Sequence, residues 1–174
     1  MTFLAVTLSA LALRGSSPAS ASAENRLVVH AHAPLPALVL DRLGGGRAGT
    51  RDSLGRVTLV HFFATWCEPC RPELASLDRL RAEKEPRGLE VLAVSVAEVE
   101  PRLRRYLAES PVGFPILLDR DRGASRAWAV DALPSTVVLD RSGHPRLAVR
   151  GDLDWQREDV RAALNELLAE TARQ

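Results

Sequence analysis

The sequence predicts an α/β fold in which helices flank a mixed central sheet. Two continuous apolar, β-prone runs, Val57 to Ala64 and Leu89 to Val96, have the composition of strands that are buried on both faces. A segment with helical spacing follows each run. Near the end of the chain, "STVVLD" and "PRLAVRG" flank the turn sequence "RSGH" and predict an antiparallel hairpin. Strands that alternate with helices and end in a hairpin are typical of this fold class.

The first elements are a hairpin and a helix. Strands at Leu38 to Leu40 and Arg47 to Thr50 are expected to pair across the glycines at 44–46, which permit a turn. "RDSLGR" then supplies a short loop or helical turn before the first buried strand. The first helix is expected from Glu68 to about Lys84, because leucines recur at positions 74, 77 and 80.

The later elements follow by the same reasoning. "EVEPRLRRYLAES" predicts a helix with Pro101 in its first turn, where a proline costs little. Phe114 to Asp119 is expected to be a strand, and "RDRGASRAWAV" a short helix. The last helix is expected from Trp155 to about Ala172, with Asp154 as its N-cap.

Length and charge limit the kinds of partner. A chain of 174 residues suits one domain with a full core. The net charge of +1 leaves no basic surplus to neutralise phosphates, so nucleic acid is not an expected partner.

Residues 1–23 differ from the rest of the chain. An uncharged apolar run, "FLAVTLSALAL", precedes a small-residue segment that ends in "ASA" at position 23. This predicts a signal peptide or an uncleaved N-terminal anchor, and the alternative is a leader with no targeting role. We expect residues 24–174 to form the folded domain, outside the cytoplasm.

The only two cysteines, Cys67 and Cys70, form a C-x-x-C pair where the first buried strand is expected to meet its helix. The free N–H groups and dipole at the start of a helix stabilise an anion, so the pKa of Cys67 should fall. Cys67 is therefore the expected exposed nucleophile, and Cys70, one turn later, the thiol that resolves the mixed disulfide. Pro69 is tolerated between them, because a first-turn N–H has no helical partner.

Other uses of two thiols remain open but are less well supported. A closed zinc site needs four ligands, and only His30 and His32 in an irregular stretch could add to the cysteines. Covalent haem attachment needs a histidine directly after the second cysteine, where this chain has Arg71. A copper metallochaperone is the binding-class alternative, since thiolates suit copper(I). Two inert core cysteines are the least expected. We therefore expect no metal and no cofactor beyond the cysteine pair.

The block "FFATWCEPCRPE" resembles the TlpA/ResA-like family of extracytoplasmic thioredoxin-fold thiol–disulfide oxidoreductases. The resemblance runs from about Pro34 to the C-terminus. It implies a thioredoxin-like fold with an N-terminal hairpin and a strand–helix insert at about 89–109. Trp66 resembles the aromatic residue that flanks the nucleophile. Pro134 resembles the cis-proline that faces the disulfide, so that Leu133 would pair with an incoming substrate chain; the alternative is an ordinary trans proline.

The resemblance also suggests which residues tune the thiols. Glu73 resembles a carboxylate beside the active site that exchanges protons with Cys70; the alternative is a solvated glutamate that complements the helix dipole. His61 differs from the pattern of the family. Thioredoxins have a buried acidic residue at that position, and members of this family often have an asparagine there. We expect a core histidine with one hydrogen bond, ahead of a proton relay behind Cys70. Glu68 would raise the pKa of the thiols and favour a reducing pair, unless it points into water.

Together these features predict a protein-disulfide reductase. Cys67 would attack a client disulfide, Cys70 would resolve it, and a membrane thiol donor would restore the pair. The resemblance makes apocytochrome c, or a carrier in its maturation, a candidate client. A general disulfide oxidant or exchanger that uses the same residues is the second enzymatic possibility.

Overall fold

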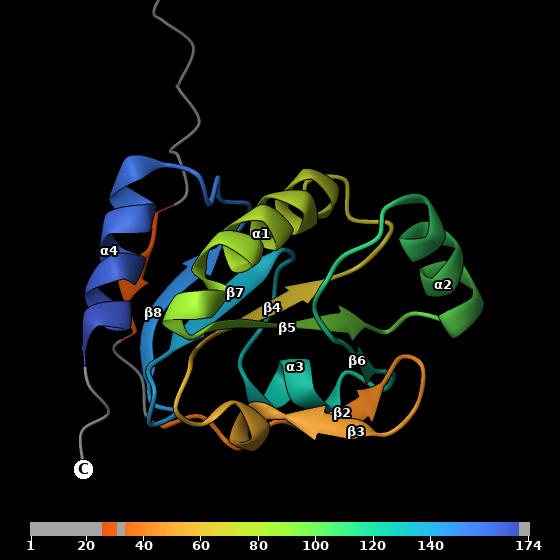
Figure 1. Cartoon of the computed structure of the whole chain (residues 1–174). Helices are drawn as coiled ribbons and strands as arrows, with labels where there is room; N and C mark the ends of the chain where they lie inside the picture. The colour runs from red at the N-terminus through yellow and green to blue at the C-terminus, as the bar shows by residue number, and fades with distance from the viewer. Residues whose placement is uncertain (1–25, 31–33, 171–174) are drawn as a thin grey trace, which may run out of the picture.

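A computed structural model describes residues 26–30 and 34–170, so the expected leader at 1–23 lies outside the described residues (Figure 1). Its centre is an eight-stranded mixed sheet with the strand order β1-β8-β7-β4-β5-β6-β2-β3. The contacts of β5 with β4 and β6 are parallel, and the other pairs are antiparallel. The strands are β1 (Val28–Val29), β2 (Val39–Arg42), β3 (Arg47–Gly49), β4 (Val57–Phe63), β5 (Leu89–Val96), β6 (Ile116–Asp119), β7 (Ser135–Leu139) and β8 (Pro145–Arg150).

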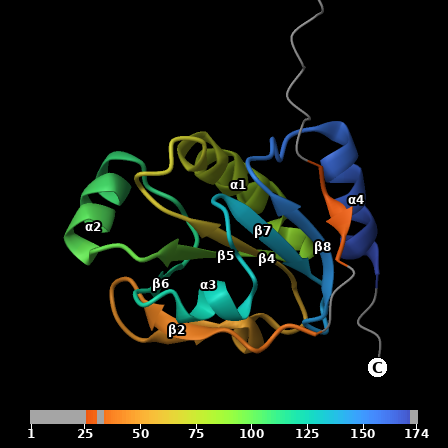
Figure 2. The ribbon, with the colours of Figure 1, turned by 180° about the vertical axis from the view of Figure 1, so that it is seen from behind.

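Four α-helices cover this sheet: α1 (Cys70–Lys84), α2 (Glu100–Glu109), α3 (Gly123–Ala127) and α4 (Glu158–Ala169). Short 3₁₀ turns occupy Thr50–Ser53 and Glu85–Arg87. α1 crosses one face of the sheet between α4 and α2, and α3 lies on the other side of the sheet (Figures 1 and 2). None of the described helices is both long and apolar enough to cross a membrane.

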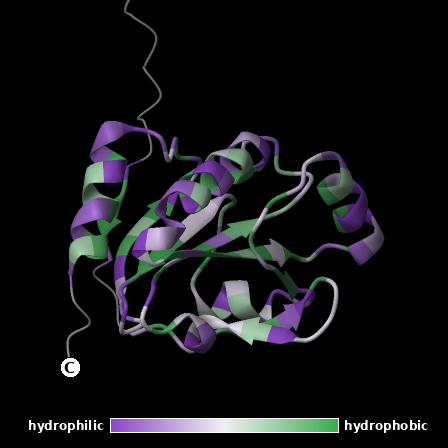
Figure 3. Cartoon of the chain, viewed as in Figure 1, coloured by the Kyte–Doolittle hydropathy of each residue, from purple (hydrophilic) through white to green (hydrophobic). Residues whose placement is uncertain are grey.

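The sheet separates two apolar cores, because neighbouring side chains of a strand point to opposite faces. Leu59 and Phe63 of β4 pack in the larger core, together with the leucines of α1 and α4. Val60 and Phe62 point the other way, into a smaller core that contains Trp128. Every residue of β4 is buried, as the apolar run predicted. Figure 3 shows the hydrophobic strands inside and the polar helix faces outside. The α/β prediction is confirmed.

Several boundaries differ from the expected ones. α1 begins at Cys70, because Cys67 to Pro69 form turns that lead into the helix. β6 begins at Ile116, because Pro115 has no N–H for strand pairing. β1 was not expected from the sequence, and its two residues pair with the edge of β8.

The start of the last helix was predicted wrongly. α4 begins at Glu158, with Arg157 at the N-cap position. Asp154 instead closes a preceding turn, where its carboxyl group accepts a hydrogen bond of 2.9 Å from the backbone N–H of Gln156. Trp155 is fully buried in the core. Its burial fixes the chain in this turn, so the helix cannot begin there.

Candidate active site

Three segments meet beside the cysteine pair because of the strand register. Phe63 at the end of β4 pairs with Ser95 of the parallel strand β5. Phe62 pairs with Ser135 at the start of the antiparallel strand β7. The loop that carries the cysteines therefore lies at the same edge of the sheet as the end of β5 and the segment before β7.

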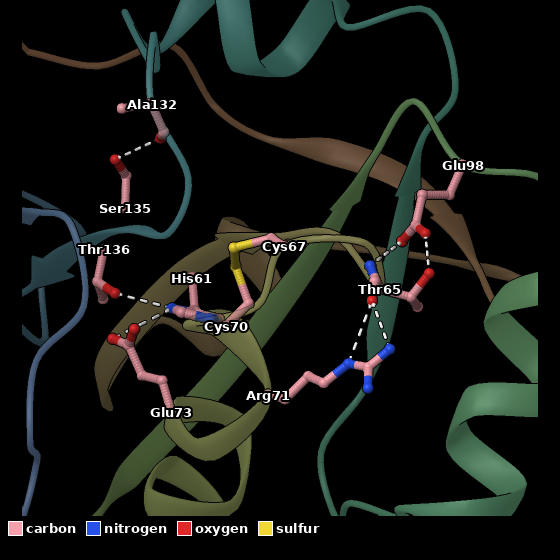
Figure 4. The surroundings of a disulfide bond; sticks show 10 residues. All are labelled: His61, Thr65, Cys67, Cys70, Arg71, Glu73, Glu98, Ala132, Ser135 and Thr136. Carbon is pink, nitrogen blue, oxygen red and sulfur yellow. Dashed lines mark hydrogen bonds and ion pairs between the residues drawn. A yellow bond between two sulfur atoms is a disulfide. The ribbon is translucent and has the colours of Figure 1, made fainter.

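Cys67 and Cys70 form a disulfide, with 2.02 Å between the sulfurs and 5.4 Å between the Cα atoms (Figure 4). Cys70 at the first turn of α1 is completely buried, and Cys67 is 6% exposed. Cys67 is thus less exposed than the sequence suggested, because its turn folds against the larger core ahead of the helix. Of the two cysteines, Cys67 is nevertheless the only one with exposed surface.

The loop before Cys67 is held by Glu98, which follows β5. Its carboxyl group accepts hydrogen bonds from the backbone N–H of Thr65, at 2.9 Å, and from the Thr65 hydroxyl. Ser95 donates to the same carboxyl group at 2.8 Å. On the other side of the loop, the Arg71 guanidinium donates to the carbonyl of Thr65. These contacts fix the approach to Cys67 from β5 and α1 together (Figure 4).

Glu73 is buried on α1, three residues after Cys70, and is only 3% exposed. Burial, with a smaller contribution from the charge of Asp152, raises the pKa of Glu73 to about 8. A hydrogen bond from the Trp155 indole N–H, 2.8 Å long, opposes this rise. Glu73 is therefore mainly protonated at neutral pH. It is not the solvated first-turn glutamate that was the alternative.

His61 lies on β4 opposite Thr136 of β7 and faces α1. Its Nδ1 shares a hydrogen bond of 2.9 Å with the Thr136 hydroxyl and lies 3.8 Å from Oε1 of Glu73. Burial lowers the pKa of His61 to about 3, so the imidazole is neutral at physiological pH. It adds no positive charge that would stabilise the thiolates. The ring has the one hydrogen bond that we expected, while Nε2 is buried without a partner among the described residues.

The residues immediately around the cysteines lie at the surface. Trp66 is 62% exposed and flanks Cys67. Glu68 and Pro69 between the cysteines are also exposed. Water screens the charge of an exposed carboxylate, so the expected effect of Glu68 on the thiols is weakened.

The Leu133–Pro134 peptide bond is cis, as the resemblance implied. Leu133 is partly buried, and its backbone N–H and C=O make no hydrogen bond within the described ranges. The Pro134 carbonyl accepts from the Gly151 N–H at 2.8 Å. Ser135 donates to the Ala132 carbonyl at 2.8 Å (Figure 4). The loop is thus held on both sides of Leu133, whose own backbone groups remain available.

The structure brings the expected residues to one edge of the sheet. Sequence reasoning missed Glu98 and Trp155, which hold Thr65 and Glu73, and it missed Thr136, the partner of His61. No short motif signals them, because they lie 33, 82 and 75 residues from their partners. No group of three or more histidine, cysteine or acidic side chains in the described part of the chain could hold a metal ion.

Residues 31–146 match the family model described as the AhpC/TSA family. The chain belongs to the AhpC/TSA family. This AhpC/TSA protein is similar to the thiol–disulfide oxidoreductase ResA of Geobacillus thermodenitrificans, with 29% identity over 76% of this chain and 75% of that protein. ResA of Bacillus subtilis is 30% identical over 68% of this chain and 66% of its own.

The fold of the AhpC/TSA protein also has solved counterparts. A thiol:disulfide interchange protein of the thioredoxin family from Chlorobium tepidum superposes with a TM-score of 0.67. The match covers 77% of this chain and 95% of that one, at 24% identity. The ResA-like resemblance and the thioredoxin-like fold are thereby confirmed. With its C-x-x-C disulfide, the chain is a thiol–disulfide oxidoreductase.

Proposed function

We propose that this oxidoreductase reduces disulfides in exported client proteins. The observation that carries the proposal is the burial of Glu73 on α1, the helix that carries Cys70, which raises the pKa of Glu73 to about 8 and keeps it protonated at neutral pH. A disulfide that is to be re-reduced must release its buried sulfur as a thiolate. A carboxylic acid on the same helix face supplies the proton that this sulfur needs.

Re-reduction proceeds in two exchanges. A donor thiolate attacks the Sγ of Cys67, the bond to Cys70 breaks, and Cys70 leaves with the electron pair. Glu73 gives its proton to this thiolate and becomes a carboxylate. A second donor thiol then displaces the first from Cys67, so that the donor leaves as a disulfide and both cysteines are reduced. A membrane thiol donor is the source that we propose.

Client reduction uses the same atoms in the opposite order. The Cys67 thiolate attacks one sulfur of the client disulfide and releases the other as a thiolate, which takes a proton from water. The carboxylate of Glu73 accepts the proton of Cys70, and Cys70 attacks Cys67 in the mixed disulfide. The client leaves as a dithiol, and the Cys67–Cys70 disulfide forms again.

The client chain is proposed to lie along Leu133. The free backbone N–H and C=O of this residue can pair with an extended peptide, as an added strand does at a sheet edge.

We further propose that the protein acts outside the cytoplasm. The apolar leader and the similarity to ResA support this location, and apocytochrome c is a candidate client. A general oxidant would use the same residues in the reverse net direction.

The experiment is a trap for the client. In the Cys70→Ser variant the mixed disulfide at Cys67 cannot be resolved, so a client that carries a disulfide should accumulate on the protein and be identified by mass spectrometry. The Cys67→Ser variant is the matched control, since Cys70 is fully buried. Equal trapping by both variants, or none by Cys70→Ser, would count against the proposed role.

A further inference from the structure

A basic groove lies beside Cys67, between the loop at Trp66 and α2. It consists of two adjoining hollows of about 310 and 330 Å³, and Arg71, Tyr106 and Glu109 line both. The name α2 groove is used below only for the hollow of about 310 Å³, which lies next to Trp66. It is lined by Thr65, Trp66, Arg71, Arg102, Arg105, Tyr106 and Glu109. Because Trp66 precedes the nucleophile directly, a chain attached to Cys67 must pass this hollow or leave on the opposite side.

The charge of the α2 groove is positive although the whole chain is nearly neutral. Three arginines and one glutamate line it, whereas the net charge of the protein is +1. Arg102, Arg105 and Glu109 recur every three or four residues on α2, so they share one face of the helix. The positive charge is therefore concentrated in the hollow that Trp66, the residue before Cys67, helps to line.

Two of the three arginines of the α2 groove have guanidinium groups that are free to bind a ligand. Neither Arg102 nor Arg105 makes an ion pair or a side-chain hydrogen bond with any residue in ranges 26–30 and 34–170. Arg104, which is not part of the groove lining, is paired with Glu100 at 3.3 Å. Arg71 is held in place by the Thr65 carbonyl and lies over the Tyr106 ring, 5.7 Å from its centroid. In Figure 4 it extends from α1 away from Glu73 and toward Thr65.

We propose that the α2 groove binds an acidic segment of the client, within a few residues of the cysteine that Cys67 attacks. Guanidinium groups bind carboxylates through paired hydrogen bonds, and three of them around one hollow favour aspartate or glutamate over neutral or basic side chains. The exposed Trp66 adds an apolar surface for the same segment. This inference rests on the proposed reductase function and names the chemistry of its substrate.

The test uses two synthetic peptides with one internal disulfide each. They are identical except that the residues next to the cysteines are acidic in one and lysine in the other. The reduced wild-type protein should reduce the acidic peptide about tenfold faster, and added salt should shrink this ratio, because it screens charges at the protein surface. In Arg102→Glu/Arg105→Glu the ratio should fall to about one or below, and in Arg102→Gln/Arg105→Gln it should fall part of the way.

The matched control is Arg51→Glu/Arg79→Glu, two exposed arginines outside the groove with the same change in net charge. It should keep most of the preference. Equal rates for the two peptides in the wild type, or a preference that survives in the groove variant, would overturn the proposal.

A binding measurement separates this inference from the proposed function. An acidic peptide without cysteines should protect Trp66 of the oxidised protein from a fluorescence quencher, since Trp128 and Trp155 are buried. If neither disulfide peptide is reduced but this protection is seen, the reductase function is contradicted and the binding of acidic segments by the α2 groove is supported. If reduction proceeds without protection or charge preference, only the binding of acidic segments is contradicted.

Discussion

At the residue scale, the site depends on two buried side chains whose pKa values move in opposite directions. Burial raises the pKa of Glu73 to about 8 and lowers that of His61 to about 3. Nδ1 of His61 and Oε1 of Glu73 are 3.8 Å apart, yet at neutral pH both groups are mainly uncharged. Desolvation disfavours whichever form carries a charge, so it keeps Glu73 protonated and His61 neutral. Glu73 is thus in the protonated form that the proposed proton transfer to Cys70 requires.

Glu73→Gln should slow the re-reduction of the disulfide by a thiol donor, because glutamine cannot protonate the departing Cys70. A lost general acid typically costs about 10²-fold in rate. The rate per donor thiolate in the wild type should fall as the pH rises through about 8, where Glu73 loses its proton. This inflection should be absent in the variant, as stopped-flow fluorescence over pH 5 to 10 would show.

Glu68→Gln is the control for that experiment, since it makes the same chemical change at an exposed position between the cysteines. Its pH profile should keep the inflection near 8. If both variants behave like the wild type, Glu73 has no part in proton transfer.

At the scale of elements, the site depends on contacts between the loop at Thr65 and the end of β5. The Glu98 carboxyl group accepts both hydrogen bonds from Thr65 and one from Ser95. α1 contributes Arg71 from the other side. The loop that precedes Cys67 is therefore held from two directions, by Glu98 after β5 and by Arg71 of α1.

Glu98→Ala should loosen this loop. It leaves the Thr65 N–H and two hydroxyl groups without their acceptor, which costs roughly 1–3 kcal/mol of stability. The Thr65 amide should then exchange with deuterium much faster. The exchange of amides in the middle of β4 should become faster only by the amount that the lower global stability accounts for. Glu83→Ala, which removes an exposed ion pair with Arg161, should leave the Thr65 amide unchanged. Unchanged protection in Glu98→Ala would contradict the role that we assign to these contacts.

The sequence was informative where local pattern decides the structure. The apolar runs at β4 and β5 predict buried strands because the strands are buried on both faces. It was less informative where a distant contact decides. Trp155 lies outside α4 because it is buried against Glu73, and β1 exists only through its pairing with β8.

The same distinction holds for the site. The C-x-x-C pair and Glu73 lie within seven residues of sequence and can be recognised together. Their surroundings cannot, since Glu98 and Trp155 approach only once the sheet and α4 are in place. The burial of Cys67 could likewise not be predicted from the sequence, because it depends on how the turn before α1 packs against the core.

At the scale of the whole molecule, the two buried groups should shape stability against pH. Glu73 has a higher pKa in the folded state than its ordinary 4.5, so its contribution is present below pH 4.5 and is lost as the pH rises to about 8. His61 has a lower pKa than its ordinary 6.5, so its contribution is present above pH 6.5 and is lost as the pH falls to about 3.

The oxidised protein should therefore be most stable between about pH 4.5 and 6.5, where the two effects oppose each other. Between pH 6.5 and 8 the free energy of unfolding should fall by roughly 2 kcal/mol, at about 1.36 kcal/mol per pH unit for one proton. Urea titrations at a series of pH values measure this directly. Glu73→Gln should flatten the alkaline limb and His61→Asn the acidic one. An alkaline limb that persists unchanged in Glu73→Gln would assign it to another group.

The molecule as a whole is proposed to work as a reductase, and its reduction potential tests that claim most directly. The potential is obtained by equilibrating the Cys67–Cys70 pair with defined thiol–disulfide buffers and counting free thiols. We predict a value near that of thioredoxin, about −270 mV, because the neutral His61 adds no charge that would favour the thiolates. A value near that of a strong oxidant, about −120 mV, would contradict the proposed reductase function.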